Sequence, residues 1–145
     1  MNITTFSDYA LRVLIYLAVD EAEKSTAKDI AASYDISFHH VAKAAQWLAR
    51  EGYIHAERGR SGGISLSRLA QDINVGELVR ATEAGTALVD CMRVDGGACS
   101  IRPACGLKQA LAEAQDAFYA VLDRVSLADV VVKRSALSQL LTVGD

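Results

Sequence analysis

The three cysteines of this chain, Cys91, Cys99 and Cys105, all lie within residues 91–105. Seven residues separate the first pair and five separate the second, so the CxxC spacing typical of zinc sites is absent. An odd number of thiols cannot pair fully into disulfides. Glycines and the only proline lie between these cysteines, which predicts a loop, whereas buried thiols that serve as small hydrophobic groups are expected on helices or strands.

Thiolates on a flexible loop can converge on one soft metal centre, and this chemistry predicts an iron–sulfur cluster or a zinc ion. Three cysteines supply three ligands, and no histidine follows residue 55. A fourth ligand therefore has to be a distant side chain, a group from a partner chain or an exchangeable molecule. Buried thiols without a metal, and a disulfide with one thiol left over, are the alternatives.

The composition of the 145 residues is that of a globular protein, with 51% hydrophobic and 23% charged side chains. This length favours one core or two small joined ones. No apolar run approaches the ~20 residues of a membrane-spanning helix. The first residues lack the basic region and cleavage site of a signal peptide. Thiols without a secretion signal indicate the cytoplasm.

Basic side chains gather in residues 37–68, where five lysines and arginines stand against two acidic residues. Residues 1–36 have three basic and six acidic side chains, and residues 69–145 have seven and ten. The net charge is −3, so this segment alone, not the whole chain, favours an anionic partner such as nucleic acid. An uneven distribution by chance is the alternative explanation.

Helical periodicity around the basic segment predicts a helix-turn-helix. The apolar spacing predicts a first helix over residues 7–19 with Ser7 as its N-cap, and a second helix capped by Ser25 or Thr26. A third helix follows Ser37. A recognition helix presents its N-terminal residues to the major groove. The candidate DNA contacts on this third helix are Ser37, His39, His40 and Lys43.

Two short strands over residues 53–58 and 64–67, joined by the sequence GRSGG, predict a hairpin after the helix-turn-helix. This order is that of a winged helix, whose glycine-rich tip lets a cation reach phosphates or the minor groove. A winged helix used only for protein contacts is the alternative. Metal binding by His39 and His40 is disfavoured, because adjacent residues on a helix do not face each other. The candidate DNA contacts in the wing are Arg58, Arg60 and Ser61.

A long helix is predicted from residue 107 to residue 124, after the cysteines. Its apolar residues recur at alternating steps of four and three, which is the spacing of a coiled-coil seam. We interpret it as a dimerisation helix, with packing inside one chain as the alternative, and expect two short C-terminal helices to pack back on the dimer. The predicted seam consists of Leu107, Leu111, Ala114, Phe118, Val121 and Val125.

The predicted fold is therefore mainly α-helical with a small β-hairpin wing: a winged helix-turn-helix followed by a long dimerisation helix. Residues 1–83 are expected to form the DNA-binding domain, residues 84–105 the cysteine loop, and residues 106–145 the dimerisation helix and the C-terminal helices. Catalysis is not expected, because the sequence has no recognisable nucleophile–base pair, phosphate-binding glycine loop or HExxH-type site.

Four segments resemble the winged-helix iron–sulfur transcription regulators, and together they span essentially the whole chain: FSDYALRVLIYLA, HHVAKAAQWLAREGYI, RGRSGGISLS and the cysteine region with PACGLKQALAEAQDAFYAVLD. Within that family the resemblance is to the nitric-oxide-sensing repressors. It implies a homodimer that binds an operator in double-stranded DNA. It also implies one [2Fe–2S] or [4Fe–4S] cluster per subunit, held by Cys91, Cys99, Cys105 and the partner subunit's Asp8.

Two positions bear on the choice of branch within the family. Sister regulators of cluster assembly carry a histidine ligand three residues after the last cysteine, and Lys108 stands there in this chain. A protonated lysine has no lone pair for iron. Asp8 matches the aspartate ligand of the nitric-oxide-sensing branch, although a carboxylate in a helix's first turn is stabilising without any metal. The gap between Cys91 and Cys99 is longer than is usual in this branch.

The function expected from these features is a DNA-binding regulator, in the first instance a repressor, whose DNA affinity falls when its cluster reacts with nitric oxide. The same ligands would serve a regulator that senses iron, cluster supply or redox state. A redox or cluster-transfer protein without DNA binding is a further alternative, and the RGRSGG wing argues against it.

Overall fold

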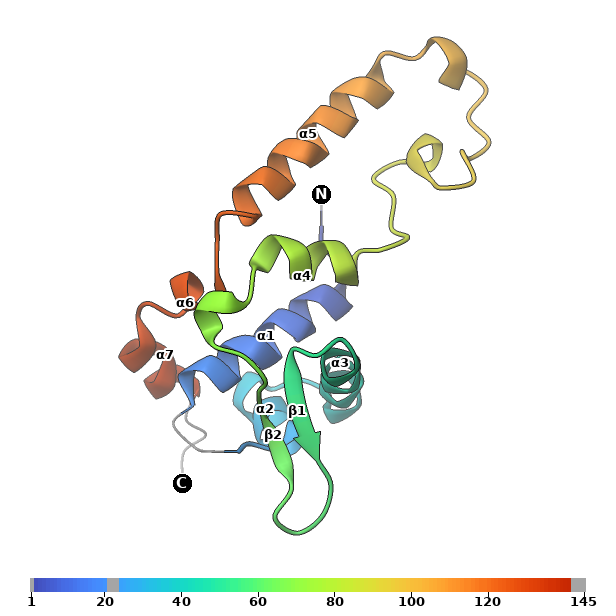
Figure 1. Ribbon diagram of the computed structural model, residues 1–145. Coiled ribbons are helices and arrows are strands. Elements are labelled where there is room, and N and C mark those ends of the chain that lie inside the picture. The colour runs from blue at the N-terminus through green and yellow to red at the C-terminus, as the bar shows by residue number, and fades with distance from the viewer. Residues whose placement is uncertain (1, 21–23, 142–145) are drawn as a thin grey trace.

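The computed structural model describes residues 2–20 and 24–141, and it is mainly helical with one two-stranded antiparallel hairpin (Figure 1). This confirms the predicted fold class. No helix in the described part of the chain is long and apolar enough to cross a membrane. The main elements are α1 (Thr5–Val19), α2 (Ala27–Tyr34), α3 (Phe38–Arg50), β1 (Ile54–Glu57), β2 (Gly63–Leu66), α4 (Val75–Thr82), α5 (Leu107–Leu122), α6 (Leu127–Val130) and α7 (Arg134–Leu141).

Helix α1 begins earlier than predicted, and its N-cap is Thr4. The Thr4 hydroxyl oxygen accepts a hydrogen bond from the backbone N–H of Ser7 at 3.2 Å. The prediction of Ser7 as the cap was wrong, because Ser7 is only 1% exposed and its hydroxyl contacts side chains at the end of α4. Further along α1, Val13 and Leu14 are fully buried in the core.

The helix-turn-helix is formed by α2 and α3, as predicted. Thr26 caps α2 through a capping box: its hydroxyl accepts the N–H of Asp29 at 3.1 Å, and the Asp29 carboxylate accepts the N–H of Thr26 at 3.1 Å. The chain turns between the helices at Asp35, which has a left-handed φ of 51°. The stripe that α3 buries against the core consists of Val41, Ala44, Ala45 and Leu48.

The hairpin that follows α3 is shorter than predicted. Its register runs from Ile54 opposite Leu66 to Glu57 opposite Gly63, where the pairing ends and the tip begins. Gly62 lies so close to the strand that enters the tip that a Cβ there would collide with the backbone of Glu57. The tight tip therefore requires glycine at position 62.

The C-terminal helices pack against α1 of the same chain. Leu127 of α6 is 1% exposed and belongs to the core formed by the winged helix. The Nε of Arg134, at the start of α7, donates to the backbone carbonyl of Val19 at 3.3 Å. Part of the segment after residue 105 therefore contributes to the core of the first segment.

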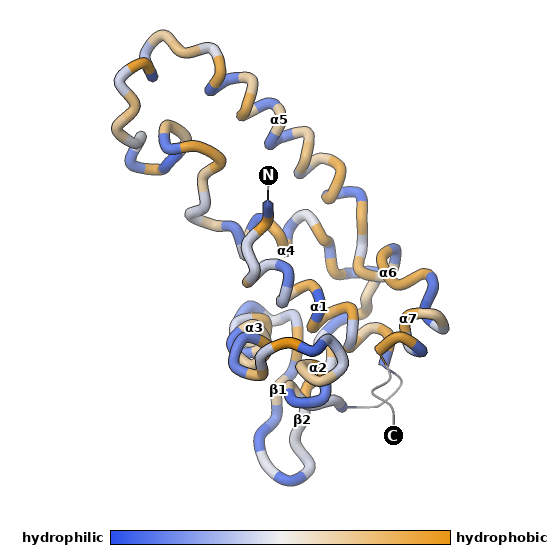
Figure 2. The backbone as a smooth tube through the Cα atoms, turned by 180° about the vertical axis from the view of Figure 1, so that it is seen from behind, coloured by the Kyte–Doolittle hydropathy of each residue, from blue (hydrophilic) through white to orange (hydrophobic). Residues whose placement is uncertain are grey.

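Helix α5 is anchored at its C-terminal end and projects away from the winged helix (Figures 1 and 2). Arg80 of α4 contacts both carboxylate oxygens of Asp123 at 2.5 and 2.6 Å. Gly76 of α4 approaches so closely that a Cβ there would collide with Asp123. The cysteine loop between α4 and α5 consequently lies at the opposite end of the molecule from the hairpin tip (Figure 1).

Two apolar faces follow α5, and the chain covers only one of them. Leu111 and Phe118 are half-buried, whereas Leu107 is 62% and Val121 is 52% exposed. The residues of the predicted seam are thus divided between a covered and an open face. The open face has alternating steps of three and four residues; it is called the exposed α5 seam below and consists of Leu107, Ala110, Ala114, Ala117 and Val121.

Candidate functional site

The N-terminal turn of α3 presents polar side chains to solvent. The hydroxyl of Ser37 at the N-cap makes no capping hydrogen bond, so it is not engaged by its own helix. The next buried residue along the chain, Val41, fixes which side of α3 faces inward. The predicted contacts at this turn that the structure leaves exposed are Ser37, His39, His40 and Lys43.

The hairpin tip carries the other predicted contacts, Arg58, Arg60 and Ser61, and all three are exposed. Among the residues that the structure describes, neither arginine forms an ion pair, whereas Glu57 just before them pairs with Lys24 at 2.5 Å. The two guanidinium groups are therefore available to phosphate oxygens. An arginine is suited to that contact because its planar donors can bind two oxygens at once.

A groove beside α3 adds candidate contacts that the sequence reasoning missed. Gln46 and Arg50 line it together with Lys43, Phe6 and Trp47. Both missed side chains are exposed and lie on the same side of α3 as Lys43. The spacing of Lys43, Gln46 and Arg50, at steps of three and four, was the available signal.

The three cysteines are free thiols, but the described residues contain no group of three or more cysteine, histidine or carboxylate side chains placed to hold a metal ion. Cys99 is exposed, while Cys91 and Cys105 are half-buried. The predicted ligands therefore do not converge within one chain in this conformation. Their chemistry nevertheless suits an iron–sulfur cluster, since three unpaired thiols on a loop rich in glycine are soft ligands with room to move.

Asp8 lies in the first turn of α1, away from the thiols of its own chain. Its carboxylate forms an ion pair with Arg12 at 3.0 Å, one helical turn later. The guanidinium of Arg12 also lies over the ring of Tyr34 at 5.5 Å and over that of Tyr9 at 6.0 Å. Burial raises the pKa of Tyr34 to about 12, so the ring beneath Arg12 stays uncharged well above neutral pH.

A partly buried polar cluster joins the start of α1 to the end of α4. The Glu83 carboxylate accepts hydrogen bonds from the N–H of Thr4 at 2.7 Å, from the Thr4 hydroxyl at 2.9 Å and from the Ser7 hydroxyl. The Ser7 hydroxyl also contacts the Thr82 hydroxyl at 2.7 Å. Burial by itself would raise the pKa of Glu83, but the hydrogen bonds from Ser7 and Thr4 outweigh it and lower the pKa.

Glu83→Gln is expected to destabilise the chain at pH 7 by about 1–2 kcal/mol, because the charge-assisted part of these hydrogen bonds is lost. The folded-state pKa of Glu83 lies below its ordinary value of 4.5, so the stabilisation is present at neutral pH and is lost as the pH falls below that value. Urea unfolding at pH 7 and at pH 4 measures both effects. The variant should be less sensitive to acid than the wild type.

Glu113→Gln on the exposed side of α5 is the matched control, and its stability should change by less than about 0.5 kcal/mol. If Glu83→Gln were as stable as this control at pH 7, the link between α1 and α4 would contribute nothing to folding.

A helix-turn-helix with exposed donors and an arginine-tipped hairpin defines a winged-helix DNA-binding protein. The chain belongs to the Rrf2 family of iron-dependent transcriptional regulators, whose family model matches residues 3–133. Within it, the chain is similar to the transcriptional regulator NsrR of Geobacillus kaustophilus, at 46% identity over 142 residues and 97% of each chain. The NsrR of Bacillus subtilis is 44% identical over 146 residues and 100% of each chain. These relatives confirm the prediction of an NsrR-type regulator, and they are transcriptional regulators, as expected for a chain without catalysis.

Solved structures agree with the fold. The global cysteine regulator CymR of B. subtilis has a TM-score of 0.72 and 25% identity, covering 92% of this chain and 98% of that one. The IscR of T. potens has a TM-score of 0.70 and 24% identity, covering 92% and 88% respectively. The winged-helix regulator fold therefore extends through almost the whole chain.

Proposed function

We propose that this chain is a homodimeric, cytoplasmic repressor whose affinity for its operator is controlled by an iron–sulfur cluster that reacts with nitric oxide. Cys91, Cys99 and Cys105 of one subunit and the partner subunit's Asp8 are the proposed ligands. The proposed contacts to double-stranded DNA are Ser37, His39, His40, Lys43, Arg58, Arg60 and Ser61.

The observation that carries this proposal is the cluster of hydrogen bonds around Glu83. The cysteine loop starts where α4 ends, and Glu83 at that end is bound to Thr4 and Ser7 at the start of α1. Asp8 is the next residue along α1. The beginning of the loop is therefore tied to α1 of its own chain, the helix that would offer Asp8 to the partner subunit's cluster. A change at either cluster would thus act on α1.

A chain of contacts then leads from Asp8 to the recognition helix. Arg12, which pairs with Asp8, lies over Tyr9, and the Tyr9 ring stacks on the His40 ring with centroids 5.5 Å apart. His40 is one of the proposed DNA contacts on α3. If Asp8 bound a metal in place of Arg12, Arg12 would lose its anionic partner. The position of Tyr9 under His40 would then no longer be held from that side. A coupling of about 1–3 kcal/mol changes DNA affinity about 5–150-fold.

The proposed ligand set also suits nitric oxide as the signal. When bound, an iron–sulfur cluster supplies iron atoms to which nitric oxide binds. The carboxylate of Asp8 is a harder ligand than the thiolates of the cysteine loop, so it would be the contact to iron that is most readily given up. An Asp8 that did not bind metal would pair with Arg12, one helical turn later in the same chain.

The exposed α5 seam supports a homodimer. Leu107 and Val121 are large apolar side chains without cover at its two ends, and the alanines between them allow a second helix to approach closely. The steps of three and four residues match the seam of a two-stranded coiled coil. Two recognition helices in one dimer can then read half-sites about 34 Å apart.

The test is an anaerobic titration of the iron-loaded protein with nitric oxide, with iron and sulfide assayed on the same sample. DNA binding is followed with duplexes selected by the loaded protein from a random library. Absorption bands that bleach in proportion to nitric oxide, together with DNA release, are the expected result. The absorption bands and DNA binding could instead withstand nitric oxide but respond to iron removal or oxidation. The signal would then be iron or redox state, not nitric oxide.

A further inference from the structure

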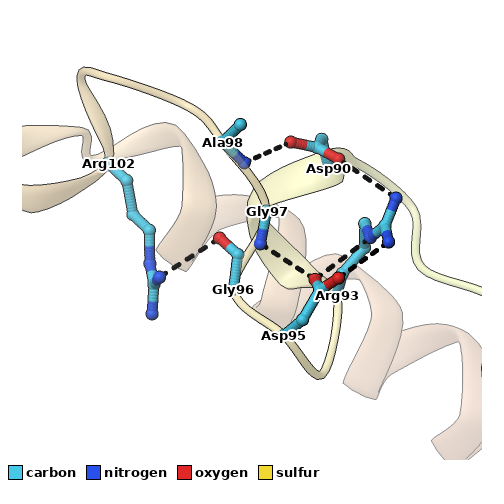
Figure 3. A network of polar contacts seen from close by, with 7 residues as sticks. All are labelled: Asp90, Arg93, Asp95, Gly96, Gly97, Ala98 and Arg102. Carbon is cyan, nitrogen blue, oxygen red and sulfur yellow. Dashed lines mark hydrogen bonds and ion pairs between the residues drawn. The ribbon is translucent and has the colours of Figure 1, made fainter.

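The long segment between Cys91 and Cys99 has a polar scaffold of its own (Figure 3). Asp90 directly precedes Cys91, and Ala98 directly precedes Cys99. The Asp90 carboxylate accepts a hydrogen bond from the backbone N–H of Ala98 at 2.9 Å. One contact thus joins the residues that come immediately before two proposed ligands.

Further polar contacts close the turn between Asp90 and Ala98. Arg93 binds the Asp95 carboxylate with two nitrogens, at 3.1 and 2.8 Å, and its third nitrogen lies 3.6 Å from Asp90. The N–H of Gly97 donates to Asp95 at 3.0 Å. Arg102, three residues before Cys105, donates to the carbonyl of Gly96 at 3.1 Å. This contact links the part of the loop that leads to Cys105 to the same turn.

Gly97 makes the close approach of Asp90 possible. Its φ of +60° is one that residues with a side chain rarely adopt, and a Cβ at this position would collide with the backbone carbonyl and the carboxylate of Asp90. The contact across the loop therefore depends on glycine at position 97 as well as on the Asp90 carboxylate.

Resting on the proposed function, we propose that Asp90 is a positioning residue that presets the separation of Cys91 and Cys99 before the metal binds. Exposed ion pairs such as that between Arg93 and Asp95 contribute little by themselves. The hydrogen bond from Ala98 to Asp90 crosses the loop directly. It removes conformational freedom that a flexible spacer of seven residues would otherwise lose on binding metal.

Asp90→Ala removes the acceptor, and Asp90→Asn keeps an acceptor oxygen while it loses the charge. Val94→Ala is the matched control, because Val94 lies in the same turn and is fully exposed. Each full-length protein is reconstituted anaerobically with ferrous iron and sulfide, and the loss of its visible absorption to a chelator is timed. Asp90→Ala should lose its cluster about 10-fold faster or more, as is usual when a group that orients a ligand is removed. Asp90→Asn and Val94→Ala should stay close to wild type.

A second measurement needs no metal. In the iron-free protein, the amide hydrogen of Ala98 should exchange with solvent faster in Asp90→Ala than in wild type or Asp90→Asn. Gly97→Ala should behave like Asp90→Ala in both measurements, because its side chain displaces the same carboxylate.

The outcomes separate this inference from the proposed function. A wild type that loads and an Asp90→Ala variant that loads and resists the chelator equally well overturn the role of Asp90 and leave the proposed function intact. Unchanged exchange of the Ala98 amide in Asp90→Ala also overturns it, with or without metal. A wild type that takes up no iron overturns the proposed function and, with it, the role of Asp90 toward the metal.

Discussion

Cys99→Ser is expected to abolish stable cluster binding and to make DNA affinity independent of nitric oxide. A serine hydroxyl is a hard, weakly acidic ligand, and iron–sulfur clusters are held by soft thiolates. Cys99 is the most exposed of the three thiols, so its replacement should leave the packing of the chain unchanged. Iron content should fall about 10-fold or more. The nitric oxide response of DNA binding, proposed above to span about 5–150-fold, should disappear.

The measurement combines iron and sulfide assays with DNA binding before and after nitric oxide. Ser100→Ala is the matched control, since Ser100 is the exposed neighbour of Cys99 in the same loop. Iron content and nitric oxide response of this control should equal those of the wild type. A Cys99→Ser protein that still held iron and still released DNA on nitric oxide would remove Cys99 from the ligand set.

Ala114→Glu is expected to dissociate the dimer and to weaken operator binding by about 10²–10⁴-fold. The two half-sites would then be bound by separate monomers and not by one linked dimer. Ala114 is the centre of the exposed α5 seam, and two copies of a glutamate would face each other there at a cost in desolvation and repulsion. Helix content should hardly change, because the side chain points away from the core of its own chain.

Sedimentation gives the mass in solution, and titration of the selected duplex gives the affinity. Ala120→Glu makes the same chemical change on the polar side of α5, where Asp116 is also exposed, and should remain a dimer. An Ala114→Glu protein that sedimented as the wild-type dimer would place the dimer interface elsewhere than on the exposed α5 seam.

Local patterns in the sequence determined the winged helix. Capping at Thr26, the buried stripe of α3 and the glycine-rich tip each involve residues only a few positions apart, so each is visible in a short window. The positions of the proposed DNA contacts follow from the same windows, because the side of α3 that buries Val41 leaves the residues before it in solvent. The concentration of thiols in one loop needed no structure to be noticed.

Contacts between distant parts of the chain were decided by the tertiary structure alone. Ser7 looked like a helix cap because serine caps helices often, but Glu83 lies 76 positions away and takes its hydroxyl. Tertiary contacts likewise decide which face of α5 is open, because steps of three and four residues allow more than one apolar seam along this helix. Which one stays open depends on how α4 is fixed to Asp123, so Leu111 and Phe118 are covered while Ala110 and Ala117 are not.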